Sequence, residues 1–212
     1  MNIPKGPILV VEDMPQIRGL LEVTLRFEGY PVVSARDGAE ALEMIKEERP
    51  ALIITDILMP KMDGFALVYH LRKNEETRDL PVIFLSATYV TKEDKDFALS
   101  LGALRFLEKP VETSEFLLTI GEILAGGVDA PSTTVNEKEF YLGYRQRLEN
   151  KLRQKSQQIS RTERLLTTLP PDQKQSFESL LEENRSHRDQ ITQELEEIIQ
   201  ELKKFETNDN SA

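Results

Sequence analysis

Charged residues follow three short apolar runs of this chain, and their types suit phosphoryl chemistry. Glu12 and Asp13 come after residues 8–11, Asp56 comes after residues 52–55, and Lys109 comes after residues 105–108. Such runs are typical of parallel strands buried on both faces, whose carboxyl ends meet at one edge of a sheet. Open α/β sheets bind their ligands at that edge. Three carboxylates and one ammonium there predict a site for a hard divalent cation and a phosphoryl group.

Apolar runs and helical patterns alternate five times along the first part of the chain. The runs lie at residues 8–11, 32–35, 52–55, 82–86 and 106–107. The helical patterns have apolar residues at intervals of three and four, and they lie at residues 14–28, 38–48, 65–73, 92–101 and 114–124. A βα unit repeated in this way predicts a doubly wound α/β domain, with a five-stranded parallel sheet, right-handed crossovers and helices on both faces.

Composition excludes several classes of protein. The 212 residues include no Cys, which rules out a disulfide framework and thiolate metal ligands. No apolar run approaches the length that crosses a bilayer, and residues 1–7 lack the pattern of an export signal, so we expect a cytoplasmic protein without membrane contact. A net charge of -10 at pH 7 disfavours a nucleic-acid surface, which needs clustered Lys and Arg.

The remainder of the chain has a different character. We expect residues 1–126 to form the α/β domain, residues 127–136 a linker of small and turn-forming residues, residues 137–206 an antiparallel two-helix hairpin, and residues 207–212 a disordered tail. The second helix has a coiled-coil stripe at Leu181, Asn184, Arg188, Ile191, Leu195, Ile198, Leu202 and Phe205. The stripe of the first helix is interrupted at Lys155 and Thr162, and it consists of Tyr141, Tyr144, Leu148, Leu152, Ile159, Leu166 and Leu169.

Opposite net charges favour pairing of these two helices. Residues 137–169 carry eight Lys or Arg against four Glu, whereas residues 172–206 carry five basic residues against ten acidic ones. Two helices alone bury little apolar surface. We therefore expect two hairpins to meet as a four-helix bundle in a homodimer.

Four motifs resemble the receiver domain of two-component response regulators, of the chemotaxis-regulator type. They are ILVVED at residues 8–13, TDILMPKMDG at 55–64, FLSA at 84–87 and FLEKP at 106–110. They occur in the family's order and spacing, and the resemblance covers residues 5–126. It implies a flavodoxin-like sheet of order 2-1-3-4-5 and a response regulator of a phosphorelay, which a histidine kinase or phosphotransfer protein would phosphorylate.

The resemblance implies a role for each motif residue. Asp56 would accept the phosphoryl group, and Lys109 would pair with one of its oxygens. Glu12, Asp13 and Asp56 would hold Mg²⁺ together with the backbone carbonyl of Leu58. The bond after Lys109 is usually cis in the family. We expect no enzymatic activity apart from phosphorylation and dephosphorylation of the protein's own Asp56.

Two further positions would carry the response to phosphorylation. The Ser86 hydroxyl would donate to the phosphoryl group, and Phe106 would rotate inward as a switch residue. Residue types alone leave alternatives open. Ser86 suits the end of a strand, Phe106 suits a static core, and Glu12 with Asp13 suits a helix cap. A receiver that no longer takes phosphate would usually lack one of these groups, and the sequence has all of them.

The helical region admits competing hypotheses. In the first, it mediates dimerisation and docking of a downstream protein target. In the second, it is itself active in phosphotransfer or phosphatase chemistry. His187 resembles the phosphorylated residue of the histidine kinase box, although Arg188 stands where that box normally has an acid. Asp189 and Gln193 resemble the acid-amide pair of helical phosphatases. A transcription factor would need a short basic recognition helix, which neither long helix provides. We favour the first.

Overall fold

The computed structural model describes residues 6–86, 92–126 and 136–209. They fall into two compact units, Met1–Val135 and Asn136–Ala212. The predicted linker at residues 127–136 lies outside the described residues except for its last position. None of the described helices is apolar enough over a sufficient length to cross a membrane.

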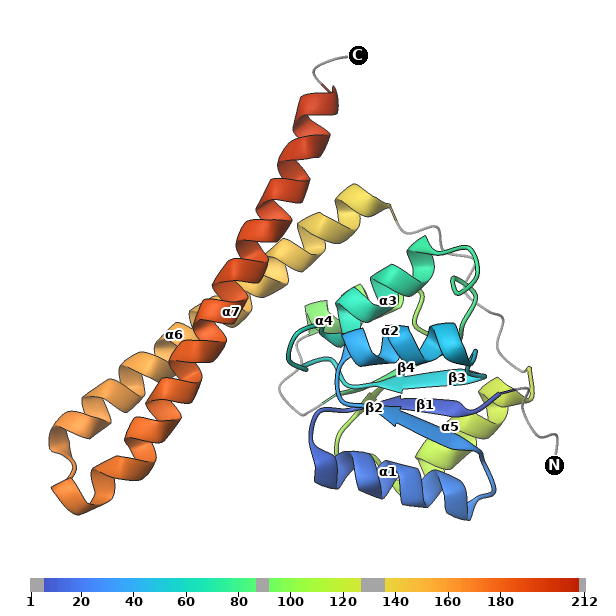
Figure 1. Ribbon diagram of the computed structural model, residues 1–212, viewed down its shortest axis with the longest axis horizontal. Helices are drawn as coiled ribbons and strands as arrows, with labels where there is room; N and C mark the ends of the chain where they lie inside the picture. The colour runs from blue at the N-terminus through green and yellow to red at the C-terminus, as the bar shows by residue number, and fades with distance from the viewer. Residues whose placement is uncertain (1–5, 87–91, 127–135, 210–212) are drawn as a thin grey trace. The chain divides into compact units, whose positions relative to one another are not determined.

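The first unit is built on a five-stranded parallel sheet (Figure 1). The strands lie in the order β2-β1-β3-β4-β5, which confirms the predicted order. Their bounds are Ile8–Val11 for β1, Val32–Ala35 for β2, Leu52–Thr55 for β3, Val82–Ser86 for β4 and Arg105–Glu108 for β5. The register pairs Val11 with Thr55, so the residues that follow β1 and β3 emerge side by side.

Five helices cover the two faces of the sheet (Figure 1). They are α1 (Pro15–Phe27), α2 (Gly38–Glu47), α3 (Gly64–Lys73), α4 (Lys92–Ser100) and α5 (Thr113–Leu124). Leu21 and Leu25 of α1 and Phe116 of α5 share a core with every second residue of the central strands, such as Ile8 and Val10. The intervening strand residues face the layer that contains α2 and α3. Central strands covered on both faces need side chains that are apolar on both, which accounts for runs such as ILVV and LIIT.

The second unit consists of two long helices, α6 (Glu137–Thr168) and α7 (Pro171–Asp209). The Asn136 side chain caps α6 by accepting the backbone N–H groups of Lys138 and Glu139. All eight stripe positions predicted for α7 are buried or half-buried. The helix continues to Asp209, so residues 207–209 of the tail predicted to be disordered are helical, and residues 210–212 lie outside the described residues.

A polar pair joins the facing sides of α6 and α7. Lys155, which interrupts the apolar stripe of α6, donates through Nζ to Oδ1 of Asn184 at 3.1 Å, and Asn184 is buried. Burial lowers the pKa of the Lys155 ammonium. Glu163 of α6 and Arg185 of α7 form a second link of 2.8 Å. Lys155 and Asn184, two of the polar positions within the stripes, are therefore hydrogen-bonded to each other across the pair.

Candidate functional site

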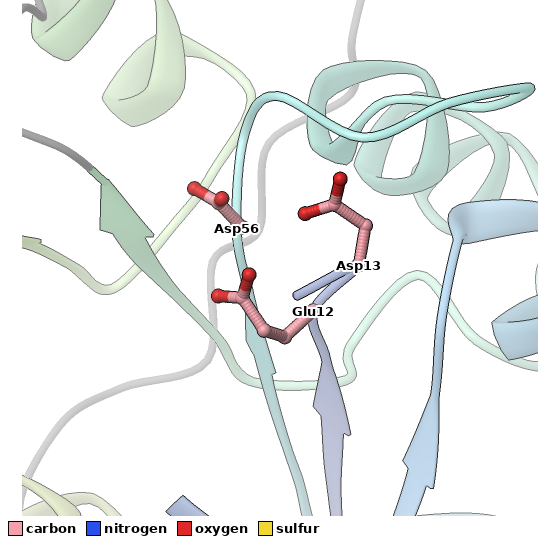
Figure 2. Close-up of side chains that lie close together, drawn as sticks. All are labelled: Glu12, Asp13 and Asp56. Carbon is pink, nitrogen blue, oxygen red and sulfur yellow. The ribbon is translucent and has the colours of Figure 1, made fainter. Parts of the chain in front are cut away.

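Three carboxylates meet at the carboxyl edge of the sheet. Glu12 and Asp13 follow β1, Asp56 follows β3, and one oxygen from each lies within 4.8 Å of the others (Figure 2). The Glu12 residue is 1% exposed, whereas Asp13 and Asp56 are half-buried. The structure thus brings together three predicted ligands of a divalent cation, and oxygen ligands are those that Mg²⁺ prefers.

Lys109 at the end of β5 completes this cluster. Its Nζ lies 2.6 Å from Oε2 of Glu12 and 3.4 Å from Oδ2 of Asp56. Its backbone N–H donates to the carbonyl of Ser86 at 2.6 Å, and the bond to Pro110 is cis. Four charged groups from three separate motifs therefore occupy one small site.

Arg18 of α1 supports the acidic loop, a role that we did not predict. Its Nη1 donates to the backbone carbonyl of Glu12 at 2.6 Å and to that of Asp13 at 3.3 Å. Oε1 of Glu12 also accepts the N–H of Met14 at 3.2 Å, but Met14 is itself the N-cap residue of α1 and no described side chain caps this helix, so the alternative role of Glu12 and Asp13 as a helix cap is wrong. A basic residue one turn into the helix after an acidic pair was the available signal.

The loop between β3 and α3 is held by backbone and side-chain contacts. Oδ1 of Asp56 accepts the N–H of Ile57 at 2.7 Å, and Gly64 donates its N–H to the carbonyl of Ile57 at 3.0 Å. Asp63 caps α3, because Oδ1 accepts the N–H groups of the two residues after Gly64. Leu58 lies on this loop with its side chain exposed, and the role of its carbonyl as a metal ligand stays a prediction.

A second unpredicted contact connects this loop to the start of α2. Nζ of Lys61 lies 2.8 Å from Oδ2 of Asp37, a buried residue that also caps α2 by accepting the N–H of Glu40. Gly38 donates its N–H to the carbonyl of Met62 at 3.0 Å. Burial opposes ionisation of Asp37, but the hydrogen bonds from Lys61 and Glu40 outweigh it and lower the Asp37 pKa.

The two predicted switch residues lie on neighbouring strands. Ser86 ends β4 and is fully buried, and its Oγ has no hydrogen-bond partner among the described residues. Phe106 of β5 is half-buried, with its ring centroid 6.4 Å from that of Phe84. A buried hydroxyl without a partner is costly, and a phosphoryl oxygen at this edge would satisfy it. Movement of either residue stays a prediction.

Burial and neighbouring charges shift the acid equilibria of the cluster. Burial raises the pKa of Asp56 to about 6, with the Glu12 charge adding to the rise and the Lys109 charge opposing it. The pKa of Asp13 is also raised, through burial and then the charge of Glu12. Crowded carboxylates of this kind gain most from a bound divalent cation, which favours their charged forms.

We expect Asp56 to make stability pH-dependent in the absence of a cation. Its folded-state pKa of about 6 lies above the ordinary 3.8, so the folded state holds the proton more tightly than the unfolded state. The contribution of this proton is present below pH 4, is lost as the pH rises to about 6, and amounts to on the order of 2 kcal/mol. Urea unfolding of the wild type and of Asp56→Asn at pH 4 and pH 7 measures it.

Only the wild type should show this loss, so the difference between the two proteins should grow from pH 4 to pH 7. Millimolar Mg²⁺ should reduce it at pH 7, because the cation replaces the proton. Parallel pH dependence of both proteins would contradict the raised pKa of Asp56.

The residues that suggested an active helical region do not form a site of their own. His187 of α7 is exposed. Asp189 accepts Nη2 of Arg188 at 2.6 Å, and Gln193 donates to Oε1 of Glu197 at 3.3 Å. Each polar group of the predicted acid-amide pair thus has a neighbour on its own helix, and nothing in these contacts favours phosphatase or phosphotransfer chemistry.

Known proteins are similar to the first unit of this chain. The family model described as the response regulator receiver domain matches residues 8–120. A probable transcriptional regulator, ycf27 of Porphyridium aerugineum, is 39% identical over 132 residues, which are 62% of this chain and 53% of that protein. Protein PilH of Pseudomonas aeruginosa is 34% identical over 56% of this chain and 98% of its own length. The chain thus spans about half the length of the ycf27 relative.

Solved structures agree with these matches. The receiver domain of a signal transduction histidine kinase from Syntrophus aciditrophicus is 35% identical, with a TM-score of 0.54, over 61% of this chain and 98% of that domain. Chemotaxis protein CheY4 of Vibrio cholerae is 33% identical, with a TM-score of 0.52, over 56% of this chain and 98% of its own. The family model, the motifs and the sheet order agree, and the chain belongs to the response regulator receiver family.

Proposed function

We propose that this protein is a phosphorelay response regulator whose Asp56 accepts a phosphoryl group from a histidine kinase or phosphotransfer protein in the cytoplasm. Mg²⁺ would be held by Glu12, Asp13, Asp56 and the backbone carbonyl of Leu58. The two long helices would self-associate and dock a protein target, and the chain would catalyse only its own phosphorylation and dephosphorylation. The observation that carries the proposal is the meeting of three carboxylates with Lys109 at one edge of the sheet.

The chemistry requires a nucleophile and compensation of negative charge. A carboxylate oxygen of Asp56 would attack phosphorus in line, forming a C–O–P bond while the bond from phosphorus to the donor nitrogen breaks and that nitrogen takes a proton. Bound Mg²⁺ would supply charge neutralisation at the phosphoryl oxygens. Lys109 already lies 3.4 Å from Asp56 and would hold one of these oxygens.

Ser86 would respond to the new group. Its buried hydroxyl, without a partner among the described residues, would donate to a phosphoryl oxygen. The backbone link between Lys109 and the Ser86 carbonyl ties the two groups that would contact the phosphoryl group. The hydrogen bond to the phosphoryl oxygen would draw Ser86 toward Asp56, and Phe106, half-buried beside Phe84, would then turn into the space that Ser86 leaves.

The experiment is labelling of the full chain with a ³²P-phosphohistidine donor, with and without Mg²⁺. We expect labelling that needs the cation and that hydroxylamine removes, because hydroxylamine cleaves acyl phosphates. Labelling that survives hydroxylamine, or that proceeds equally in EDTA, would overturn the proposal.

Replacing Lys109 by Ala should slow phosphate uptake by about 100-fold, since it removes a charge placed to stabilise the transferring group. It should also lower the free energy of unfolding by about 2 kcal/mol without Mg²⁺, because the buried Glu12 loses a cation at 2.6 Å. Rapid-quench ³²P labelling measures the rate of phosphate uptake, and urea unfolding measures the free energy of unfolding.

Lys46→Ala is the matched control, because the Lys46 side chain is 69% exposed and, among the residues that the structure describes, pairs only with Glu43 on its own helix. It should change neither quantity measurably. If Lys109→Ala took up phosphate at the wild-type rate, the assignment of this ammonium to the phosphoryl group would be wrong.

The target that we propose is a protein rather than DNA. The ycf27 relatives are named as transcriptional regulators, but the match to the Porphyridium protein covers only 53% of its length. Residues 172–206 of α7 include ten acidic residues and five basic ones, and this negative charge disfavours contact with the phosphate backbone of DNA. Long exposed helices rich in charged residues suit helix-to-helix docking instead.

A further inference from the structure

One face of α6 forms a shallow basic depression. Its volume is about 750 Å³, and the side chains that line it all come from α6, with Ser156 and Ser160 in the middle and Arg153, Arg161 and Arg164 around them. The one carboxylate of the lining, Glu149, pairs with Arg145 on the same helix at 3.3 Å. The three arginines are exposed, and within the described part of the chain they form no ion pair. Small residues between unpaired cations leave room for another helix to approach.

An acidic stripe runs along the outer side of α7. Its positions are separated by four, seven and seven residues, close to whole turns, and it consists of the exposed residues Glu178, Glu182, Asp189 and Glu196. Asp189 pairs with the adjacent Arg188. The three glutamates of the stripe form no ion pair with any described residue. The stripe lies away from the seam with α6, where Leu181, Ile191 and Ile198 are buried.

We propose that the basic depression of α6 receives the acidic stripe of α7 from a second copy of this chain. The inference rests on the self-association included in the proposed function, and it names the surfaces that meet. Each copy carries both surfaces, so a two-fold axis makes the same contact twice and closes the assembly as a dimer.

Length and charge favour a second copy over other occupants. At 1.5 Å per residue, the stripe from Glu178 to Glu196 extends about 27 Å, and the arginines from Arg153 to Arg164 extend about 16 Å, so one stripe covers the whole depression. The opposite charges would select which faces meet.

Two charge-reversal variants of the full chain test this contact by sedimentation equilibrium. The first carries Arg153→Glu and Arg164→Glu, and the second carries Glu182→Lys and Glu196→Lys. The wild type should sediment at twice the 24.3 kDa chain mass. Each variant alone should dissociate, with a dimer dissociation constant raised roughly 100-fold or more by like charges that face each other.

An equimolar mixture of the two variants should recover the dimer with wild-type affinity. Both reversed faces then meet a reversed partner, and both natural faces meet a natural partner. Raising the salt from about 0.1 M to about 1 M should weaken the wild-type dimer, since the Debye length falls from about 10 Å to about 3 Å. A mixture that stays monomeric, or reversed variants that dimerise as the wild type does, would overturn the proposal.

The matched control carries Arg26→Glu and Lys46→Glu on exposed positions of α1 and α2, with the same change in net charge as the first variant. It should dimerise normally. Binding of a fluorescent DNA duplex tests whether the basic depression receives nucleic acid instead of a second copy. If the variant with Arg153→Glu and Arg164→Glu lost duplex binding but sedimented with the wild-type mass, the dimer contact would be wrong. Mg²⁺-dependent labelling of Asp56 should be unchanged in all variants, so failure of the dimer contact and failure of the phosphoacceptor are distinguishable.

Discussion

Replacing Asp56 by Asn should abolish Mg²⁺-dependent phosphate uptake while the receiver unit stays folded. The amide keeps the shape of the side chain and its contact with the Ile57 N–H, but it offers no carboxylate nucleophile. Labelling should fall by at least about 1000-fold, to the background of the assay. The free energy of unfolding at pH 7 without Mg²⁺ should rise, because the neutral amide removes the charge whose burial raises the pKa of Asp56.

Asp79→Asn provides the matched control, since this carboxylate is 63% exposed and pairs with Arg49 far from the cluster. It should take up phosphate at the wild-type rate. Persistent, hydroxylamine-sensitive label in Asp56→Asn would show that another carboxylate is the acceptor, and tryptic mapping would then locate it.

Replacing Gly64 by Ala should destabilise the receiver unit by on the order of 3 kcal/mol and slow phosphate uptake as well. A Cβ at this position would overlap the backbone carbonyl oxygen of Asp56 and would lie 3.0 Å from Cε1 of Phe84. Backbone cannot give way as a flexible side chain can, so the loop must move and carry the phosphoacceptor with it. Urea unfolding and stopped-flow labelling measure the two effects.

Two other helical glycines serve as controls for helix propensity. Gly19 in α1 and Gly121 in α5 have nothing within 4 Å of an added Cβ. Ala at either position should stabilise the protein by about 0.5 to 1 kcal/mol. If Gly64→Ala were as harmless as these, the close approach of α3 to Asp56 would not be a constraint on the site.

The sheet order could be predicted from the resemblance to receiver domains, and the carboxylate cluster from the acidic residues that follow two of the strand runs. Once β1 and β3 are parallel neighbours, residues 12 and 56 must emerge together, whatever the loops do. The supporting contacts could not. Lys61 reaches Asp37 from a backbone with φ of 63°, a left-handed conformation that nothing in a Lys side chain signals. Arg18 is likewise one of many surface-type cations until the carbonyls that it contacts are located.

In the helical unit, too, the buried positions could be predicted but a polar contact between elements could not. Its stripe positions followed from helical periodicity, because burial against a neighbour needs apolar residues every three or four positions. The sequence showed Lys155 only as an interruption of the stripe of α6 and Asn184 only as a polar member of the stripe of α7. Their mutual hydrogen bond depends on the axial alignment of the two helices, which periodicity in either helix does not contain.

That bond also restricts how the helical pair can move. Sliding α6 along α7 would separate the Lys155 ammonium from the Asn184 amide and leave the buried amide oxygen without this donor, at a cost of about 1 to 3 kcal/mol. Piston-like translation between the two helices is therefore opposed by the polar pair at their interface. A signal that passed through this unit without breaking the bond would therefore travel as tilt or bending of the pair rather than as sliding.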